Sequence, residues 1–84
     1  MDFVSACKFC YSEFQEENAA IGKIRDCGEY WTFYQKSDVD EYGTVPIIVY
    51  KNDKEPVAMT FDLFLKLAPE IEKATLIEVP KEFS

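Results

Sequence analysis

The chain has no histidine among its 84 residues, and it has only three glycines and three cysteines. Without histidine the commonest general base is missing, and so few glycines leave no glycine-rich phosphate loop. No apolar run approaches the roughly 20 residues of a membrane span. Residues 1–10 carry a single lysine, so they lack the basic segment of a secretory signal. We therefore expect a protein of the cytoplasm that is not an enzyme.

Acidic residues outnumber basic ones by sixteen to nine, which gives a net charge of -7. Such a chain repels the phosphates of nucleic acids and anionic membrane surfaces, so we expect neither as a partner, and we expect no cofactor. The charge favours a protein with a basic surface, and the alternative partner is a second copy in a homodimer. Apolar residues make up 48%, enough to predict one small folded domain over residues 1–84.

The segment "ACKFCYSEF" places two cysteines in a C-x-x-C spacing. Apolar positions here step by four and three, which predicts an amphipathic helix within residues 2–17, with this buried side: Phe3, Cys7, Cys10 and Phe14. A redox pair would need a strand before Cys7, and a zinc site would need a fourth ligand besides Cys7, Cys10 and Cys27. We interpret Cys7 and Cys10 as core residues with no metal, and a thiol or metal protein is the lesser alternative.

Four strands are predicted to follow the first helix. They lie around Ile21 and Ile24, then at residues 30–35, 45–52 and 56–60, and a second helix and a last strand come after them. This pattern predicts an α+β protein of order α-β-β-β-β-α-β, with both helices on an antiparallel sheet of four or five strands. Residues 81–84 are predicted to form a loose tail.

The strand "YWTFYQ" is dense in residues that favour β-strands. Its two-residue period turns Trp31 and Phe33 toward the first helix and puts Tyr30, Thr32 and Tyr34 on the other face. That second row is expected to be either exposed or covered by the second helix.

The second helix is predicted at residues 61–74, with Thr60 as its N-terminal cap. Its buried side is expected to consist of Phe61, Phe64 and Leu65, together with Leu67 and Ala68. Because Pro69 cannot donate a backbone hydrogen bond, the segment is expected to form either two short helices or one kinked helix.

Tyrosines and acids gather around the loop at residues 36–44. Tyrosine is favoured at the centre of protein interfaces, and acidic side chains beside it speed the encounter with a basic protein. We therefore predict a partner-binding surface made of Tyr30, Tyr34, Asp38, Asp40, Glu41 and Tyr42.

The stretches "YWTFYQ", "GTVPIIVYKND" and "TFDLFLKL" follow one another within residues 28–67. In this order they resemble the small bacterial proteins of the YrhB-like immunity group, and "VYKNDKEPVAMTFDLFLKL" is similar to the C-terminal part of SUKH-type immunity proteins. The resemblance implies a bacterial cytoplasmic protein that binds and neutralises a secreted toxin, often a nuclease, without catalysis. A self-associating structural or accessory subunit is the alternative function.

Overall fold

The computed structural model describes residues 2–16, 19–36, 46–52 and 54–84. The elements occur in this order: α1 (Phe3–Gln15), β1 (Ile21–Asp26), β2 (Tyr30–Gln35), β3 (Ile47–Tyr50), β4 (Val57–Ala58), α2 (Phe61–Glu72), β5 (Thr75–Ile77) and the 3-10 helix η1 (Lys81–Phe83). The strands form one antiparallel sheet in the order β4-β3-β2-β1-β5. The predicted α+β class and element order are therefore confirmed.

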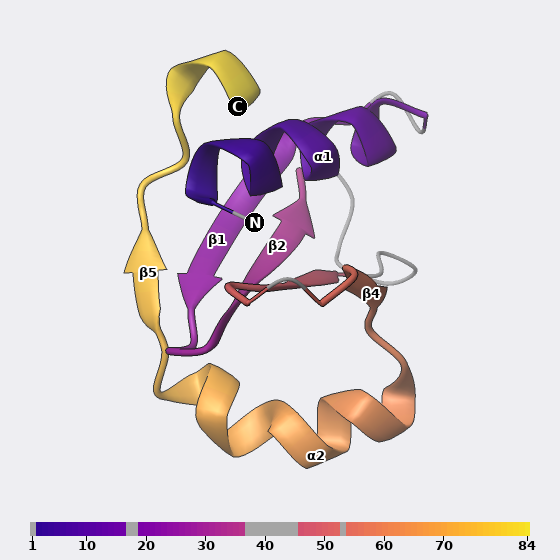
Figure 1. Ribbon diagram of the computed structural model, residues 1–84, viewed down its shortest axis with the longest axis vertical. Helices are drawn as coiled ribbons and strands as arrows, with labels where there is room; N and C mark the ends of the chain where they lie inside the picture. The colour runs from indigo at the N-terminus through magenta and orange to yellow at the C-terminus, as the bar shows by residue number, and fades with distance from the viewer. Residues whose placement is uncertain (1, 17–18, 37–45, 53) are drawn as a thin grey trace.

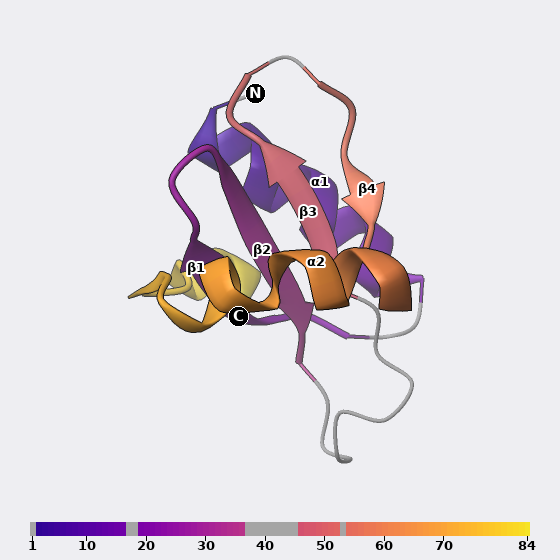
Figure 2. The same ribbon diagram turned by 90° about the horizontal axis from the view of Figure 1, so that it is seen from below.

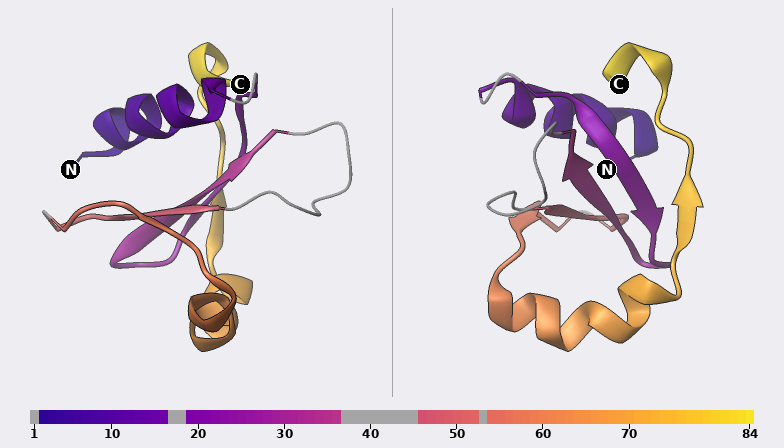
Figure 3. Two further views of the ribbon diagram at one scale, coloured as in Figure 1. Left: turned by 90° about the vertical axis from the view of Figure 1, so that its right-hand side faces the viewer. Right: turned by 180° about the vertical axis from the view of Figure 1, so that it is seen from behind.

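The two helices lie on opposite sides of this sheet (Figure 1). Figure 3 shows α1 above the strands and α2 below them, in a view along the axis of α2. Strand β2 pairs with β1 on one side and β3 on the other, so its side chains are central on both faces. A central strand that is apolar on both faces needs cover on both, and the two helices provide it.

The larger core lies between α1 and the sheet. Helix α1 begins at its N-cap Asp2, whose Oδ1 accepts a hydrogen bond of 2.7 Å from the backbone N–H of Ser5. The buried residues of this core are Ala6, Cys7, Cys10, Phe14, Ile21, Ile24, Trp31, Phe33, Val49 and Phe83. Trp31 and Phe33 thus face α1, as the two-residue period of β2 predicts, and the predicted burial of Cys7 and Cys10 is confirmed.

The chain end at residues 81–84 is not the loose tail that we predicted. Residues Lys81–Phe83 form η1, and the ring of Phe83 is buried against α1 with its centroid 5.6 Å from that of Tyr11. Phe83 belongs to the larger core cluster, which holds this short segment against the rest of the protein. The C-terminal segment thus lies beside α1 (Figure 1).

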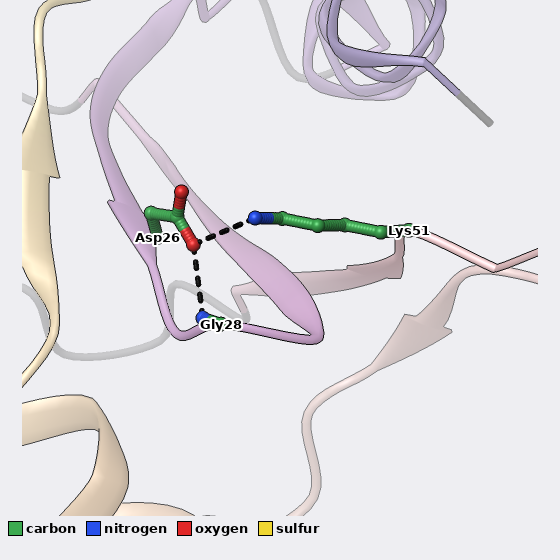
Figure 4. A network of polar contacts seen from close by, with 3 residues as sticks. All are labelled: Asp26, Gly28 and Lys51. Atoms are coloured by element: carbon green, nitrogen blue, oxygen red, sulfur yellow. Dashed lines mark hydrogen bonds and ion pairs between the residues drawn. The ribbon is translucent and has the colours of Figure 1, made fainter.

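One polar network ties the turn between β1 and β2 to the end of β3 (Figure 4). Asp26 Oδ1 accepts hydrogen bonds of 2.9 Å from the backbone N–H of Gly28 and from Lys51 Nζ. Gly28 has a φ of 95°, a conformation that side chains with a Cβ rarely adopt. The hydrogen bond from Lys51 and that from Gly28 hold the pKa of Asp26 below its usual value. The network therefore fixes the turn with a carboxylate that stays charged.

The two buried thiols make the stability of the fold sensitive to alkaline pH. Burial raises the pKa of Cys7 to about 11 and places the pKa of Cys10 well above its usual range. Both thiols stay protonated in the folded chain at pH values where the unfolded chain, with thiol pKa values near ~8.5, releases those protons. Their contribution to stability is complete below that value and is lost as the pH rises toward the folded-state pKa.

We expect the free energy of unfolding, measured in urea at several pH values from 7 to 10.5, to fall above pH ~8.5 by up to about 1.4 kcal/mol per pH unit for each thiol. The Cys7→Ala, Cys10→Ala double variant has no thiol to titrate in α1, so its stability is expected to fall less over the same range. Parallel pH profiles for the two proteins would contradict this account.

Candidate functional site

Helix α2 packs on the sheet through a row of side chains spaced one turn apart. Thr60 caps its first turn, with Oγ1 accepting a hydrogen bond of 3.1 Å from the N–H of Leu63. The second core cluster lies here, on the face of the sheet opposite α1. It consists of Tyr30, Ile48, Met59 and Ile71, with Cys27, Tyr50, Leu63 and Leu67 packed against it.

Two polar contacts fix the rotation of α2 about its own axis. Tyr30 Oη donates a hydrogen bond of 2.8 Å to Glu70 Oε2, and Arg25 Nη1 donates one of 2.9 Å to the carbonyl oxygen of Ile71. Burial raises the pKa of Tyr30 above its usual range, so the hydroxyl keeps the proton that it donates. Each contact joins the C-terminal half of α2 to a central strand, β2 or β1.

The side of α2 that we predicted to be buried faces outward instead. The exposed fractions of Phe61, Phe64 and Leu65 are 75%, 45% and 58%. Together with the half-buried Ala68 they form what we call the outer stripe. Of the predicted buried side, only Leu67 packs on the second core cluster. The prediction failed because α2 has two adjacent apolar arcs, the outer stripe and the arc of Leu63, Leu67 and Ile71. The hydrogen bonds at Glu70 and Ile71 turn the second arc toward the sheet.

Helix α2 also runs without a break through Pro69, from Phe61 to Glu72. The alternative of two short helices is therefore wrong. Proline removes one backbone donor from the helix, yet the hydrogen bond from Arg25 and the packing of Ile71 hold the turn that follows it. All four residues of the outer stripe precede Pro69 and lie in the first turns of this helix.

The outer stripe presents a substantial apolar surface to solvent. At roughly 200 Å² per phenylalanine side chain, Phe61 and Phe64 alone expose about 240 Å². With Leu65 and Ala68 the stripe enters the range of about 300–600 Å² in which the largest apolar patch of a monomer is often functional. Residues three and four apart on a helix are neighbours, so this surface is contiguous.

The structure describes only two of the six predicted partner-binding residues. Tyr30 is buried beneath α2, so its ring is not part of the exposed surface. Tyr34 is half-buried, and its ring lies 5.0 Å from Lys23 Nζ and 6.0 Å from the guanidinium of Arg25. The other four, which are Asp38, Asp40, Glu41 and Tyr42, lie outside the described residues.

Sequence reasoning missed the outer stripe as a candidate site, although it named the residues. A helix that packs on a sheet through one side needs apolar residues over an arc of about 100°. The apolar residues of α2 cover nearly twice that arc. The positions Leu63, Leu67 and Ile71 repeat every four residues, independently of the stripe. This excess of apolar surface was the signal that one arc had to remain outside the core.

The three thiols do not assemble into one site. Cys7 and Cys10 lie in the core under α1, whereas Cys27 packs on the cluster under α2, and burial raises its pKa too. Within residues 2–16, 19–36, 46–52 and 54–84 no group of three or more histidine, cysteine or acidic side chains is placed to hold a metal ion. Raised pKa values are the opposite of what a reactive thiol requires.

The chain matches no protein-family model, no curated protein and no solved structure. The resemblance to immunity proteins therefore stays a prediction. In the described part of the chain, no helix has the length and apolar character needed to cross a bilayer.

Two phenylalanines offer a direct check on the orientation of α2. Phe33 is fully buried under α1 and Phe61 is three-quarters exposed. We expect Phe33→Ala to lower the free energy of unfolding by about 3–5 kcal/mol, and Phe61→Ala to change it by no more than about 0.5 kcal/mol. Urea unfolding followed by circular dichroism measures both. A cost above about 2 kcal/mol for Phe61→Ala would place that ring in the core.

The bond between Tyr30 and Glu70 is tested by removing one hydroxyl. Tyr30→Phe keeps the buried ring and deletes the donor to a carboxylate, so we expect a loss of about 1–2 kcal/mol in the free energy of unfolding. Tyr50→Phe is the matched control, because the Tyr50 ring lies 5.9 Å from that of Tyr30 but is half-exposed. Its loss is expected to stay below about 0.5 kcal/mol. Equal losses of unfolding free energy in the two variants would show that the hydrogen bond from Tyr30 to Glu70 does not stabilise the fold.

Proposed function

We propose that this chain is a non-catalytic protein-binding module, and that it acts as an inhibitor-like or immunity-like protein toward a partner with a basic surface. The observation that carries the proposal is the outer stripe of α2. It leaves Phe61, Phe64 and Leu65 exposed on a helix whose other side is anchored to the sheet. The largest exposed apolar patch of a monomer is often functional, and a rigid helix with two exposed aromatic rings suits the binding of another protein.

The charge of the chain supports a basic partner. A net charge of -7 attracts cationic surfaces over a distance and raises the rate of encounter with them. A bacterial cytoplasmic inhibitor of a secreted toxin needs a binding face and a charge opposite to that of its target. It needs no catalytic group. The resemblance of residues 28–67 to immunity proteins leads to the same proposal.

Self-association as a structural or accessory subunit is the second candidate function. The observation in its favour is the same exposed stripe, since an apolar face can pair with its own copy around a two-fold axis. The exposed Leu76 on the edge strand β5 adds apolar surface at the other end of α2.

The proposal is tested by immobilising the chain and passing the lysate of its own source cell over it at low and at high salt. We expect one basic protein to be retained in stoichiometric amount at low salt and lost at high salt. With that protein purified, replacing Asp38, Asp40 and Glu41 together by alanine is expected to slow association and weaken its salt dependence. An acidic partner, or retention that salt does not change, would contradict the proposal.

A concentration series by sedimentation serves as the control for the second candidate. A chain that stays monomeric up to about 100 μM and retains a basic partner supports the inhibitor-like function. A chain that dimerises at micromolar concentration and retains no other protein supports the self-associating subunit instead. Such a dimer would be expected to bury about 800 Å² of each copy.

A further inference from the structure

We propose that the outer stripe of α2 inserts as a helix into an apolar groove of the partner protein, and that the rim of this groove carries lysine or arginine. The inference rests on the proposed function. It adds the surface of this chain that makes the contact and the chemistry of the surface that receives it.

The spacing of the stripe is that of a helix that binds in a groove. Phe61, Phe64, Leu65 and Ala68 occupy positions i, i+3, i+4 and i+7, the pattern by which an amphipathic helix places its anchors in an apolar cleft. The two aromatic rings supply most of the surface, and aromatic side chains are enriched among residues that dominate binding energy. The small Ala68 lets the groove wall approach the helix backbone.

The helix is accessible and already held in the form that such a groove would bind. Seen from below, α2 crosses in front of strands β1, β2 and β3 (Figure 2). Its cap at Thr60 and its contacts at Glu70 and Ile71 fix both ends in the free protein. Because little ordering is left to be done on binding, most of the energy of the apolar contact contributes to affinity.

The charges along α2 predict a basic rim. At about 100° per residue, Glu72 lies within roughly 30° of the centre of the stripe and continues its line beyond Ala68. Asp62 lies roughly 110° from the same centre, on the side of Leu65. Lys66 and Lys73 fall roughly 130° or more from that centre. The charge nearest the apolar surface on α2 is thus the exposed carboxylate of Glu72, in a chain with a net charge of -7, and a cationic rim complements it.

A second copy of the chain fits this surface less well. The phenylalanines of two stripes pressed together would bury about 500 Å², so most of the ~1,600 Å² of a standard interface would have to come from other residues. The pair would also bring together two chains of charge -7 with acids beside both stripes. A groove in another protein surrounds the helix on three sides and therefore buries more of each ring.

The test uses the full chain with a photoreactive benzoylphenylalanine at one position. At Phe61 the probe lies on the stripe, and at Lys66, in the control protein, it lies on the far side of the same helix. Each protein is illuminated in the lysate of its source cell, and the linked peptides are identified by mass spectrometry. We expect a link from position 61 to a different protein, in an apolar segment bordered by lysine or arginine, and no such link from position 66.

Once the cross-linked protein has been purified, its Kd for variants of this chain distinguishes the contribution of the apolar contact from that of the charged rim. We expect Leu65→Glu to raise the Kd at least tenfold, and Leu76→Glu to leave it within about twofold. These residues are a matched pair, since their exposed fractions are 58% and 64% and only Leu65 lies on the stripe. Glu72→Gln is expected to weaken binding and its salt dependence, whereas Lys66→Gln is expected to leave both unchanged. Circular dichroism confirms that each variant is folded.

Several results would overturn the inference. They are a link from position 61 to a second copy of the chain, equal links from both positions, no link at all, and equal effects of Leu65→Glu and Leu76→Glu. The proposed function fails separately, when the immobilised chain retains no basic protein. Retention of a basic partner that does not link to position 61 would leave the function standing and place its surface elsewhere.

Discussion

The central strand β2 is apolar on both faces, and the need to cover both determines the layering of the protein. Trp31 and Phe33 on one face pack under α1, and Tyr30 on the other packs under α2. A tyrosine suits the second face because its ring is buried while its hydroxyl reaches a polar partner. That partner is Glu70 of α2, 2.8 Å away. The position of the second helix follows from this contact.

The same contact leaves an apolar surface outside the core. With Glu70 held by Tyr30 and the carbonyl of Ile71 held by Arg25, Leu63 and Leu67 turn inward. Phe61, Phe64 and Leu65 then have no place against the sheet, because the two arcs of the helix cannot face it together. Exposure of these three residues reduces the solubility of a chain that has no use for them. A chain of charge -7 tolerates that better than a neutral one.

The element types and their order could be predicted because they rest on local patterns. The four-three spacing around Cys7 and Cys10 identified α1, and the alternation in "YWTFYQ" assigned the two faces of β2. The rotation of α2 could not be predicted, because both of its arcs satisfy the same periodicity. What decides between them is a pair of long-range polar contacts, from Tyr30 and Arg25, that local sequence does not reveal.

Of the predicted binding surface the structure describes only Tyr30 and Tyr34, and it buries Tyr30. Tyrosines were expected to form the binding surface, since tyrosine is common at interfaces, but Tyr30 serves to anchor a helix. Phe61 was assigned to the buried side of the second helix together with Phe64 and Leu65, but it is 75% exposed. Burial of Phe83 in a segment that we expected to be loose shows the same limit. A residue's type sets its average burial, while its neighbours in the fold decide the individual case.

The orientation of α2 is the claim on which the proposed site depends, and leucine methyl groups report on it directly. In an NMR measurement at low micromolar concentration, a soluble gadolinium chelate broadens methyl signals in proportion to their contact with solvent. The structure predicts strong broadening for Leu65, which is 58% exposed, and weak broadening for Leu67 and Ile71 on the inner side. A protected Leu65 beside an exposed Leu67 would contradict the account, because the helix would then be rotated and the outer stripe would be part of the core.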